Sequence, residues 1–198
     1  MNEDQLKIKS KIIEVTEMGL TDKSNLHSYD DIYPFLFEKY LNKKKLNIFE
    51  LGTGFGGGLL ILSELFPNAD IYALDHNYTG PYCVKPDTLP DDRKEHQIID
   101  LDNRNIKFLD PMDQSSPDIL NQIPSSIDII IDDASHDYYK SMESFNLLLP
   151  NLKEGGIYII EDVYPHFYSF YENDSRFKIF NNINVKNRTD DVIAVFYN

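Results

Sequence analysis

From residue 46 onward, short apolar runs alternate along the chain with stretches of helical periodicity. This alternation is typical of βαβ units, in which a parallel sheet is covered by helices on both faces. The pattern therefore predicts an α/β protein with a doubly wound, mostly parallel sheet. The expected strands are 46–51, 71–74, 106–109, 127–131 and 157–160, and the expected helices among them include 57–66 and 137–149.

The end of the chain follows another pattern. Residues 177–183 and 191–197 both resemble strands, and the turn-rich segment between them, 184–190, leaves no room for a helix. Two strands joined without a crossover pair in antiparallel fashion. We therefore expect the sheet to close with a C-terminal antiparallel hairpin.

The length of 198 residues fits a single domain. Helical periodicity over 5–18 and 31–42 predicts an N-terminal helical cap, 1–45, on a Rossmann-like core, 46–198. Residues 76–105 form a long polar segment rich in Pro and Asp. We interpret this segment as a lid or a surface insertion.

Composition excludes several classes of partner. The formal net charge is −14, so phosphate backbones would repel the chain and we expect no nucleic-acid partner. A single cysteine, Cys83, excludes an internal disulfide and suits a reducing compartment. No apolar run approaches the roughly 18 residues of a membrane span, and the start of the chain lacks signal-peptide character. We therefore expect a cytoplasmic protein with no membrane partner.

The first strand of the core runs into a glycine-rich turn. Gly52, Gly54 and Gly56 allow the backbone to approach a ligand closely, and a helix begins directly afterwards. Asp75 lies at the end of the next strand, where an acid can accept hydrogen bonds from ribose hydroxyls. At this point NAD and S-adenosylmethionine are both possible cofactors.

Glu50 distinguishes the two cofactors. Its carboxylate directly precedes the glycines, where it would repel a pyrophosphate but favour an ammonium and a sulfonium. The segment resembles motif I of the class I S-adenosylmethionine-dependent methyltransferases, and Asp75 resembles their ribose-binding acid. The resemblance implies the class I methyltransferase fold and S-adenosylmethionine as cofactor.

Two later strands end in paired acids. Asp132 and Asp133 end one strand, His136 follows at a helix start, and Glu161 and Asp162 end the next strand. The carboxyl ends of neighbouring parallel strands meet at the same edge of a sheet, where open α/β folds bind ligands. Carboxylates and a histidine without cysteine indicate a hard-cation site for Mg²⁺ or Mn²⁺, with His136 available as a base.

Three separated motifs give a more specific resemblance. D-D-x-S-H, G-G-x-Y-x-I-E-D and T-D-K-x-x-x-H-x-Y-x-x-x-Y resemble the macrocin and mycinamicin sugar O-methyltransferases, relatives of proteins labelled cephalosporin hydroxylase. The likeness extends from about Thr21 to Tyr197. It implies that Asp133, Glu161 and Asp162 bind the metal and that His136 is the general base.

The resemblance also implies further cofactor contacts. Thr21, His27 and Tyr29 belong to the N-terminal motif, which lies near cofactor and substrate in that family. An acid after the third strand should bind the adenine amino group. Asp110 and Asp113 are the candidates, and Asp113 is favoured because Asp-Gln-Ser follows a family pattern. The expected cofactor-binding residues are Glu50, Gly52, Gly54, Gly56, Asp75, Asp113, Asp132, Thr21, His27 and Tyr29.

The expected function is methylation of a hydroxyl on a sugar or a glycosylated small molecule, dependent on S-adenosylmethionine and a divalent metal. One alternative is a catechol-type metal-dependent O-methyltransferase with an aromatic acceptor. Another, from a different class, is an NAD-dependent oxidoreductase. The acceptor and the oligomeric state stay open, a homo-oligomer being one option.

Overall fold

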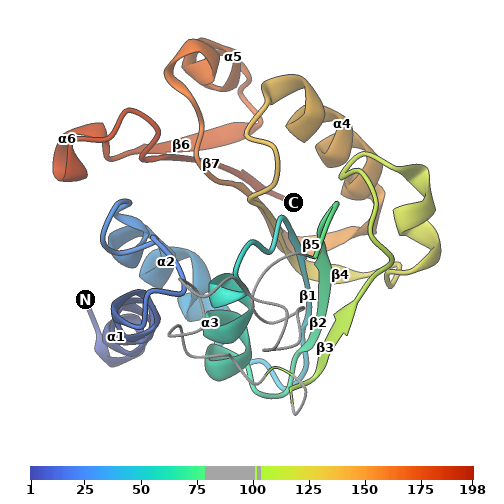
Figure 1. Ribbon diagram of the computed structural model, residues 1–198, viewed down its shortest axis with the longest axis horizontal. Coiled ribbons are helices and arrows are strands. Elements are labelled where there is room, and N and C mark those ends of the chain that lie inside the picture. The colour runs from blue at the N-terminus through green and yellow to red at the C-terminus, as the bar shows by residue number, and fades with distance from the viewer. Residues whose placement is uncertain (79–100, 102–103) are drawn as a thin grey trace, which may run out of the picture.

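The computed structural model describes residues 1–78, 101 and 104–198. Within them, seven strands form one sheet in the order β3-β2-β1-β4-β5-β7-β6, with helices on both faces (Figure 1). The strands are β1 (Asn47–Leu51), β2 (Asp70–Leu74), β3 (Ile106–Phe108), β4 (Ile127–Asp132), β5 (Leu152–Ile160), β6 (Phe177–Asn181) and β7 (Val192–Tyr197).

The pairing directions confirm the predicted fold. The five strands β3, β2, β1, β4 and β5 pair with one another in parallel, whereas β7 is antiparallel to both β5 and β6. One detail of the expectation is wrong, because a single helical turn, α6 (Ile183–Lys186), lies between β6 and β7. Four residues suffice for one turn, and Asn187 then leaves the helix with a left-handed φ of 58°.

The helices divide between the two faces of the sheet (Figure 1). Because side chains alternate along a strand, Ile129 and Ile131 of β4 belong to one core and Ile130 to the other. The first core is covered by α1 (Glu3–Glu17), α2 (Tyr29–Phe37) and α3 (Gly57–Leu65), and the second by α4 (Tyr138–Leu148) and α5 (Tyr168–Asn173). Short 3₁₀ turns occupy Glu38–Tyr40, Pro117–Asn121, Leu149–Asn151 and Pro165–Phe167.

The N-terminal helices join the first core. A capping box of Asn2 and Gln5 begins α1, whose buried side chains include Ile8, Ile12 and Val15. The helix expected over 31–42 is shorter, since α2 ends at Phe37 and continues as a 3₁₀ turn. Most of the proposed lid, 76–105, lies outside the described residues.

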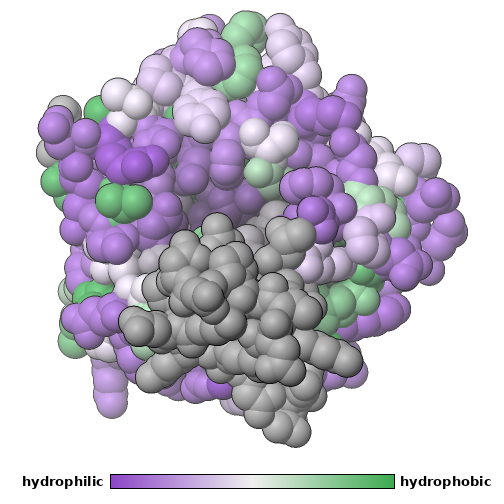
Figure 2. Space-filling model, in the orientation of Figure 1, coloured by the Kyte–Doolittle hydropathy of each residue, from purple (hydrophilic) through white to green (hydrophobic). Residues whose placement is uncertain are grey.

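The surface in view is mostly hydrophilic, with a hollow among polar side chains near its centre (Figure 2). Among the helices that the structure describes, none combines the length and the apolar character required to span a membrane.

A buried aspartate links the cap to the last strand. Asp191, just before β7, is fully buried. Its carboxylate accepts hydrogen bonds from the backbone N–H of Ser28 at 2.9 Å and from the Ser28 hydroxyl at 2.8 Å. These bonds tie the loop before α2 to the hairpin, and so help to position the residues of the N-terminal motif.

We expect Asp191→Ala to lower the free energy of unfolding by about 1–3 kcal/mol, because two buried donors lose their acceptor. Urea denaturation followed by circular dichroism measures the change. Glu143→Ala is a suitable control, since its exposed carboxylate lies 3.7 Å from Lys140, and it should change stability by less than about 0.5 kcal/mol. Equal stability of Asp191→Ala and wild type would contradict the structural role of this link.

Candidate active site

The register of three parallel strands gathers the polar residues at one edge of the sheet. Leu51 of β1 lies beside Asp132 of β4, which lies beside Ile160 of β5. The N–H of Asp133 donates to the Leu51 carbonyl at 2.9 Å, and the N–H of Glu161 donates to the Asp132 carbonyl at 3.0 Å. The acids that follow β4 and β5 therefore adjoin the turn that follows β1.

A cavity of about 360 Å³ opens at this edge. Its walls come from the loop between α1 and α2, from the end of β1, from the glycine turn and from the end of β4. Its lining residues are Gly19, Leu20, Thr21, Asp22, Lys23, Asn25, Glu50, Gly52, Thr53, Gly54, Phe55, Gly57, Gly58 and Asp133. Of the expected cofactor-binding residues, the cavity thus contains Thr21, Glu50, Gly52 and Gly54.

Close packing explains two of the glycines. A Cβ atom on Gly52, whose φ is 77°, would lie 2.1 Å from the carbonyl oxygen of Asp133. A Cβ atom on Gly58 would lie 2.1 Å from Oε1 of Glu50. Any side chain at these positions would push the turn away from β4 or displace the Glu50 carboxylate. Gly56 precedes α3 with a left-handed φ of 82°, which also favours glycine.

Asp75, which follows β2, binds the backbone of the glycine turn. Its Oδ2 accepts from the N–H of Thr53 at 3.0 Å and from the N–H of Gly54 at 3.3 Å. Its other oxygen accepts from the N–H of Asn77 at 3.2 Å. The predicted ribose-binding acid therefore contacts the same turn as the cavity.

Glu50 is buried at the cavity with an unsatisfied oxygen. Within the described residues, its Oε2 atom has no hydrogen-bond partner. Burial raises the pKa of its carboxyl from 4.5 to about 8, although the charge of Lys23 opposes the shift. A buried carboxylate oxygen without a donor is a site for a cationic ligand group, which fits the ammonium of S-adenosylmethionine.

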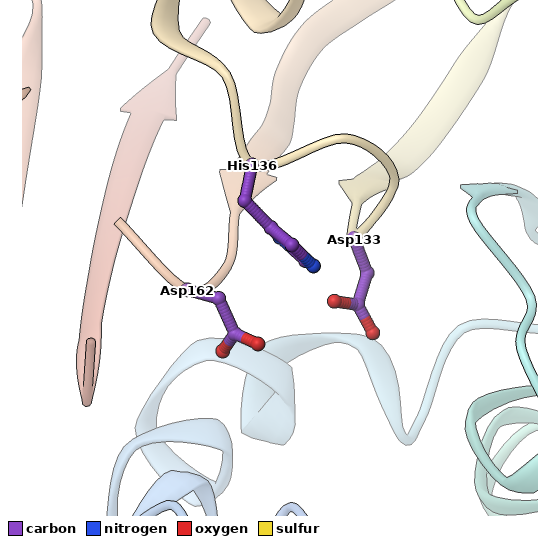
Figure 3. Close-up of side chains that lie close together, drawn as sticks. All are labelled: Asp133, His136 and Asp162. Atoms are coloured by element: carbon purple, nitrogen blue, oxygen red, sulfur yellow. The ribbon is translucent and has the colours of Figure 1, made fainter. Parts of the chain in front are cut away.

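A second group of side chains lies beside the cavity. Ligand atoms of Asp133, His136 and Asp162 all lie within 4.8 Å of one another. The three side chains converge from the loops after β4 and β5 (Figure 3). Two carboxylates and an imidazole at this spacing are ligands suited to Mg²⁺ or Mn²⁺. The donor set therefore fits the expected divalent ion.

Two members of this group, His136 and Asp162, have unusual backbone conformations. His136 and Asp162 have left-handed φ values of 56° and 52°, and among the described non-glycine residues only Asn187 shares this conformation. Such conformations are costly for residues with a Cβ atom and often occur at functional sites. The two strained residues lie where both loops turn back toward each other.

Asp162 also holds two residues of the N-terminal motif. Tyr29 donates its hydroxyl hydrogen to Asp162 Oδ1 and accepts from the Asp162 N–H at 3.0 Å. His27 Nδ1 lies 3.3 Å from the same carboxylate oxygen. Burial raises the pKa of Asp162 to about 8, and the charge of Asp133 adds to the shift. The structure thus places His27 and Tyr29, expected at the cofactor, against the three-residue group.

Glu161 lies next to this group but faces other partners. It is almost fully buried, and its two oxygens accept from the Lys23 ammonium and the Tyr33 hydroxyl. Lys23 Nζ also lies 3.0 Å from Asp133 Oδ2. Lys23 is the lysine of the T-D-K motif, and a basic residue in a motif near so many acids is the sequence signal for this ion pair.

Three acids that we expected to bind the adenine or another part of the cofactor do not line the cavity. Asp132 is buried on the face of β4 that it shares with Ile130, where its carboxylate accepts from the side-chain amide of Gln114 at 3.2 Å. Burial raises the pKa of Asp132 to about 7. Asp113 forms an ion pair with Lys140 at 3.2 Å, and Asp110 is exposed. None of these acids is among the described residues that line the cavity.

Comparisons with known proteins identify a family for this chain. A family model described as a methyltransferase domain matches residues 49–163. The chain is 26% identical over 178 residues to demethylmacrocin O-methyltransferase of Streptomyces fradiae, covering 84% of this chain and 40% of the relative. It is 27% identical over 168 residues to mycinamicin VI 2''-O-methyltransferase of Micromonospora griseorubida, covering 81% and 38%.

A solved structure shares the fold. It is a methyltransferase from the mycinamycin biosynthetic pathway in complex with Mg, SAH and mycinamycin VI, at 24% identity and a TM-score of 0.57. The match covers 85% of this chain and 39% of that one. The chain thus spans about two fifths of the length of these relatives.

Replacing Glu50 should alter how stability depends on pH. Folding raises its pKa from 4.5 to about 8, so between these values the folded state binds more protons than the unfolded state. Stability contributed by this group is present at low pH and is lost as pH rises toward 8. Lys23, Asp133 and Asp75 are the charged groups that act on it.

We therefore expect the stability of Glu50→Gln, relative to wild type, to increase from pH 5 to pH 8. Urea unfolding of the metal-free and ligand-free proteins at pH 5, 6.5 and 8 measures this difference. Glu14→Gln, with a side chain that is 60% exposed, should follow the wild-type curve. If the curves of Glu50→Gln and wild type run parallel, Glu50 is not the group that titrates.

Proposed function

Because this chain belongs to the class I S-adenosylmethionine-dependent methyltransferases, with the family model matching residues 49–163, we propose a specific activity for it. The proposed activity is divalent-metal-dependent methylation of a hydroxyl on a sugar or a glycosylated small molecule. The observation that carries the proposal is the group of Asp133, His136 and Asp162 beside the cavity at the glycine turn.

Residues around the cavity support binding of the methyl donor. S-adenosylmethionine would supply a methyl group activated by a sulfonium. Glu50 would accept from its ammonium, since Oε2 has no partner among the described residues. Asp75 would accept from the ribose hydroxyls, and Gly52 and Gly54 would allow the backbone close to the ligand.

The acids after β4 and β5 support a metal site. A divalent ion would supply a positive charge that lowers the pKa of a hydroxyl. Asp133 and Asp162 would bind the ion. The family resemblance implies Glu161 as a further ligand. In the present geometry Glu161 is held by Lys23 and Tyr33, so its direct participation requires a change of partners.

His136 is suited to take the proton from the acceptor hydroxyl. Its Nδ1 atom is buried and has no hydrogen-bond partner among the described residues. The ring lies close enough to Asp133 and Asp162 to serve either as a metal ligand or as a base. We assign it the role of base, because a general base near the hydroxyl accelerates such a transfer by typically ~10²–10⁴-fold.

The choice of a sugar hydroxyl draws on the relatives. Demethylmacrocin O-methyltransferase and mycinamicin VI 2''-O-methyltransferase are both similar to this chain over about four fifths of its length. An aromatic catechol acceptor is the alternative that the same metal chemistry would permit. Family membership disfavours the nicotinamide oxidoreductase, as does a carboxylate at Glu50.

Methyl transfer should require a divalent ion, whereas cofactor binding should not. With mycinamicin VI or demethylmacrocin as trial acceptors, we expect chelation to abolish turnover and Mg²⁺ or Mn²⁺ to restore it. Ca²⁺ should restore it poorly, because it is larger and takes a looser shell of ligands. Calorimetry should give similar S-adenosylmethionine affinities with and without chelator. Full turnover in chelated protein would refute the metal requirement.

Metal binding can also be measured without an acceptor. Asp162→Asn should weaken Mn²⁺ binding, as followed by electron paramagnetic resonance. Asp174→Asn is a matched control, since that aspartate pairs with Arg176 and is not one of the three converging residues. Equal Mn²⁺ affinity in both variants would remove Asp162 from the ligand set.

His136→Ala should separate the base from the metal ligands. We expect turnover to fall by about 10²–10⁴-fold while Mn²⁺ affinity is retained. The remaining activity should rise with pH, since hydroxide can partly replace the base. His166→Ala removes an imidazole that packs against the Phe167 ring in a tilted arrangement, with the ring centroids 4.0 Å apart, and this variant should keep its turnover number. A parallel loss of Mn²⁺ affinity in His136→Ala would make His136 a ligand.

A further inference from the structure

Lys23 is a buried cation in the loop between α1 and α2. It is 4% exposed, and it is the one basic residue among the described residues that line the cavity. Its ammonium donates to Asp133 Oδ2 at 3.0 Å and to Glu161 Oε2. A buried ammonium costs free energy unless carboxylates or other acceptors pair with it.

The contacts of Lys23 leave one donor available. An ammonium has three N–H donors, and the hydrogen bonds to Asp133 and Glu161 account for two. The ring of Tyr29 lies 5.7 Å from Nζ, which permits only a weak cation–π contact. Among the described residues, Lys23 makes no third hydrogen bond to a side chain, so a ligand in the cavity can accept from it.

Glu50 supplies the complementary group. Its unpartnered Oε2 atom belongs to the same cavity, and its charge interacts with that of Lys23. The cavity therefore offers one carboxyl oxygen without a hydrogen-bond partner among the described residues and one cationic donor. A zwitterionic amino acid carries an ammonium and a carboxylate on one carbon atom, and so presents the matching pair.

We propose that Lys23 binds the α-carboxylate of the amino-acid end of S-adenosylmethionine, while Glu50 accepts from its α-ammonium. The inference rests on the proposed function, because it concerns the methyl donor of that reaction. Besides Lys23, the charged residues among the described lining of the cavity are the acids Asp22, Glu50 and Asp133, which would not attract a ligand carboxylate. Lys23 is thus a residue that selects ligands with a carboxylate.

The test compares two ligands that differ only in this carboxylate. S-adenosylmethionine and decarboxylated S-adenosylmethionine are titrated calorimetrically into the full chain in the presence of chelator. Wild type should bind the decarboxylated ligand about 10- to 100-fold more weakly, as expected for the loss of a charge-assisted hydrogen bond. Lys23→Met should lose affinity for S-adenosylmethionine and bind both ligands within about threefold. Lys23→Arg should keep part of the preference.

A matched control removes an equivalent charge elsewhere. Lys9 forms ion pairs with Asp30 and Asp31 away from the cavity, so Lys9→Met should retain the wild-type preference. The proposal is overturned if wild type binds both ligands equally, or if Lys23→Met keeps the preference of wild type. If Lys23→Met does not fold, the wild-type comparison and Lys23→Arg decide. If wild type binds neither ligand, the proposed function itself fails.

Discussion

Parallel pairing of β1, β4 and β5 brings three strand ends to one edge of the sheet, and the site depends on this pairing. An acidic residue lies at or within one position of the end of each strand, so the sheet gathers groups whose negative charges would repel one another. Burial disfavours the charged form of these carboxyl groups, and it raises the pKa of both Glu50 and Asp162 to about 8. Nearby cations oppose this shift and favour the ionised carboxylates.

The chain supplies one of those cations itself. Lys23 comes from the loop before α2 and reaches Asp133 and Glu161, which belong to different strands. Tyr29 and Tyr33 of α2 donate to Asp162 and Glu161. The N-terminal helices are therefore more than a cover for the apolar core, because their polar residues complete the acidic edge. The link between Ser28 and Asp191 fixes this loop to β7.

Glycine residues and left-handed backbone conformations determine how closely the glycine turn and the loops after β4 and β5 approach one another. Gly52 lies against the backbone of Asp133, and Gly58 lies against the Glu50 carboxylate, at distances that exclude a Cβ atom. His136 and Asp162 adopt left-handed backbone conformations that direct both side chains toward Asp133. A cavity for the cofactor and a group suited to a metal ion thus share one wall, formed by Asp133.

Local patterns in the sequence were sufficient to predict the sheet, the closing hairpin and the acids at the strand ends, because apolar periodicity and chain order determine strand pairing. The same periodicity also separates the two acids at the end of β4. Asp132 shares the face of Ile130, and Asp133 comes one residue later, so the two acids diverge. Only the tertiary structure decided that Glu161 meets Lys23, whereas Asp133, His136 and Asp162 converge. Lys23 and Glu161 are 138 positions apart, and no local pattern encodes a contact made by packing a loop against a distant strand.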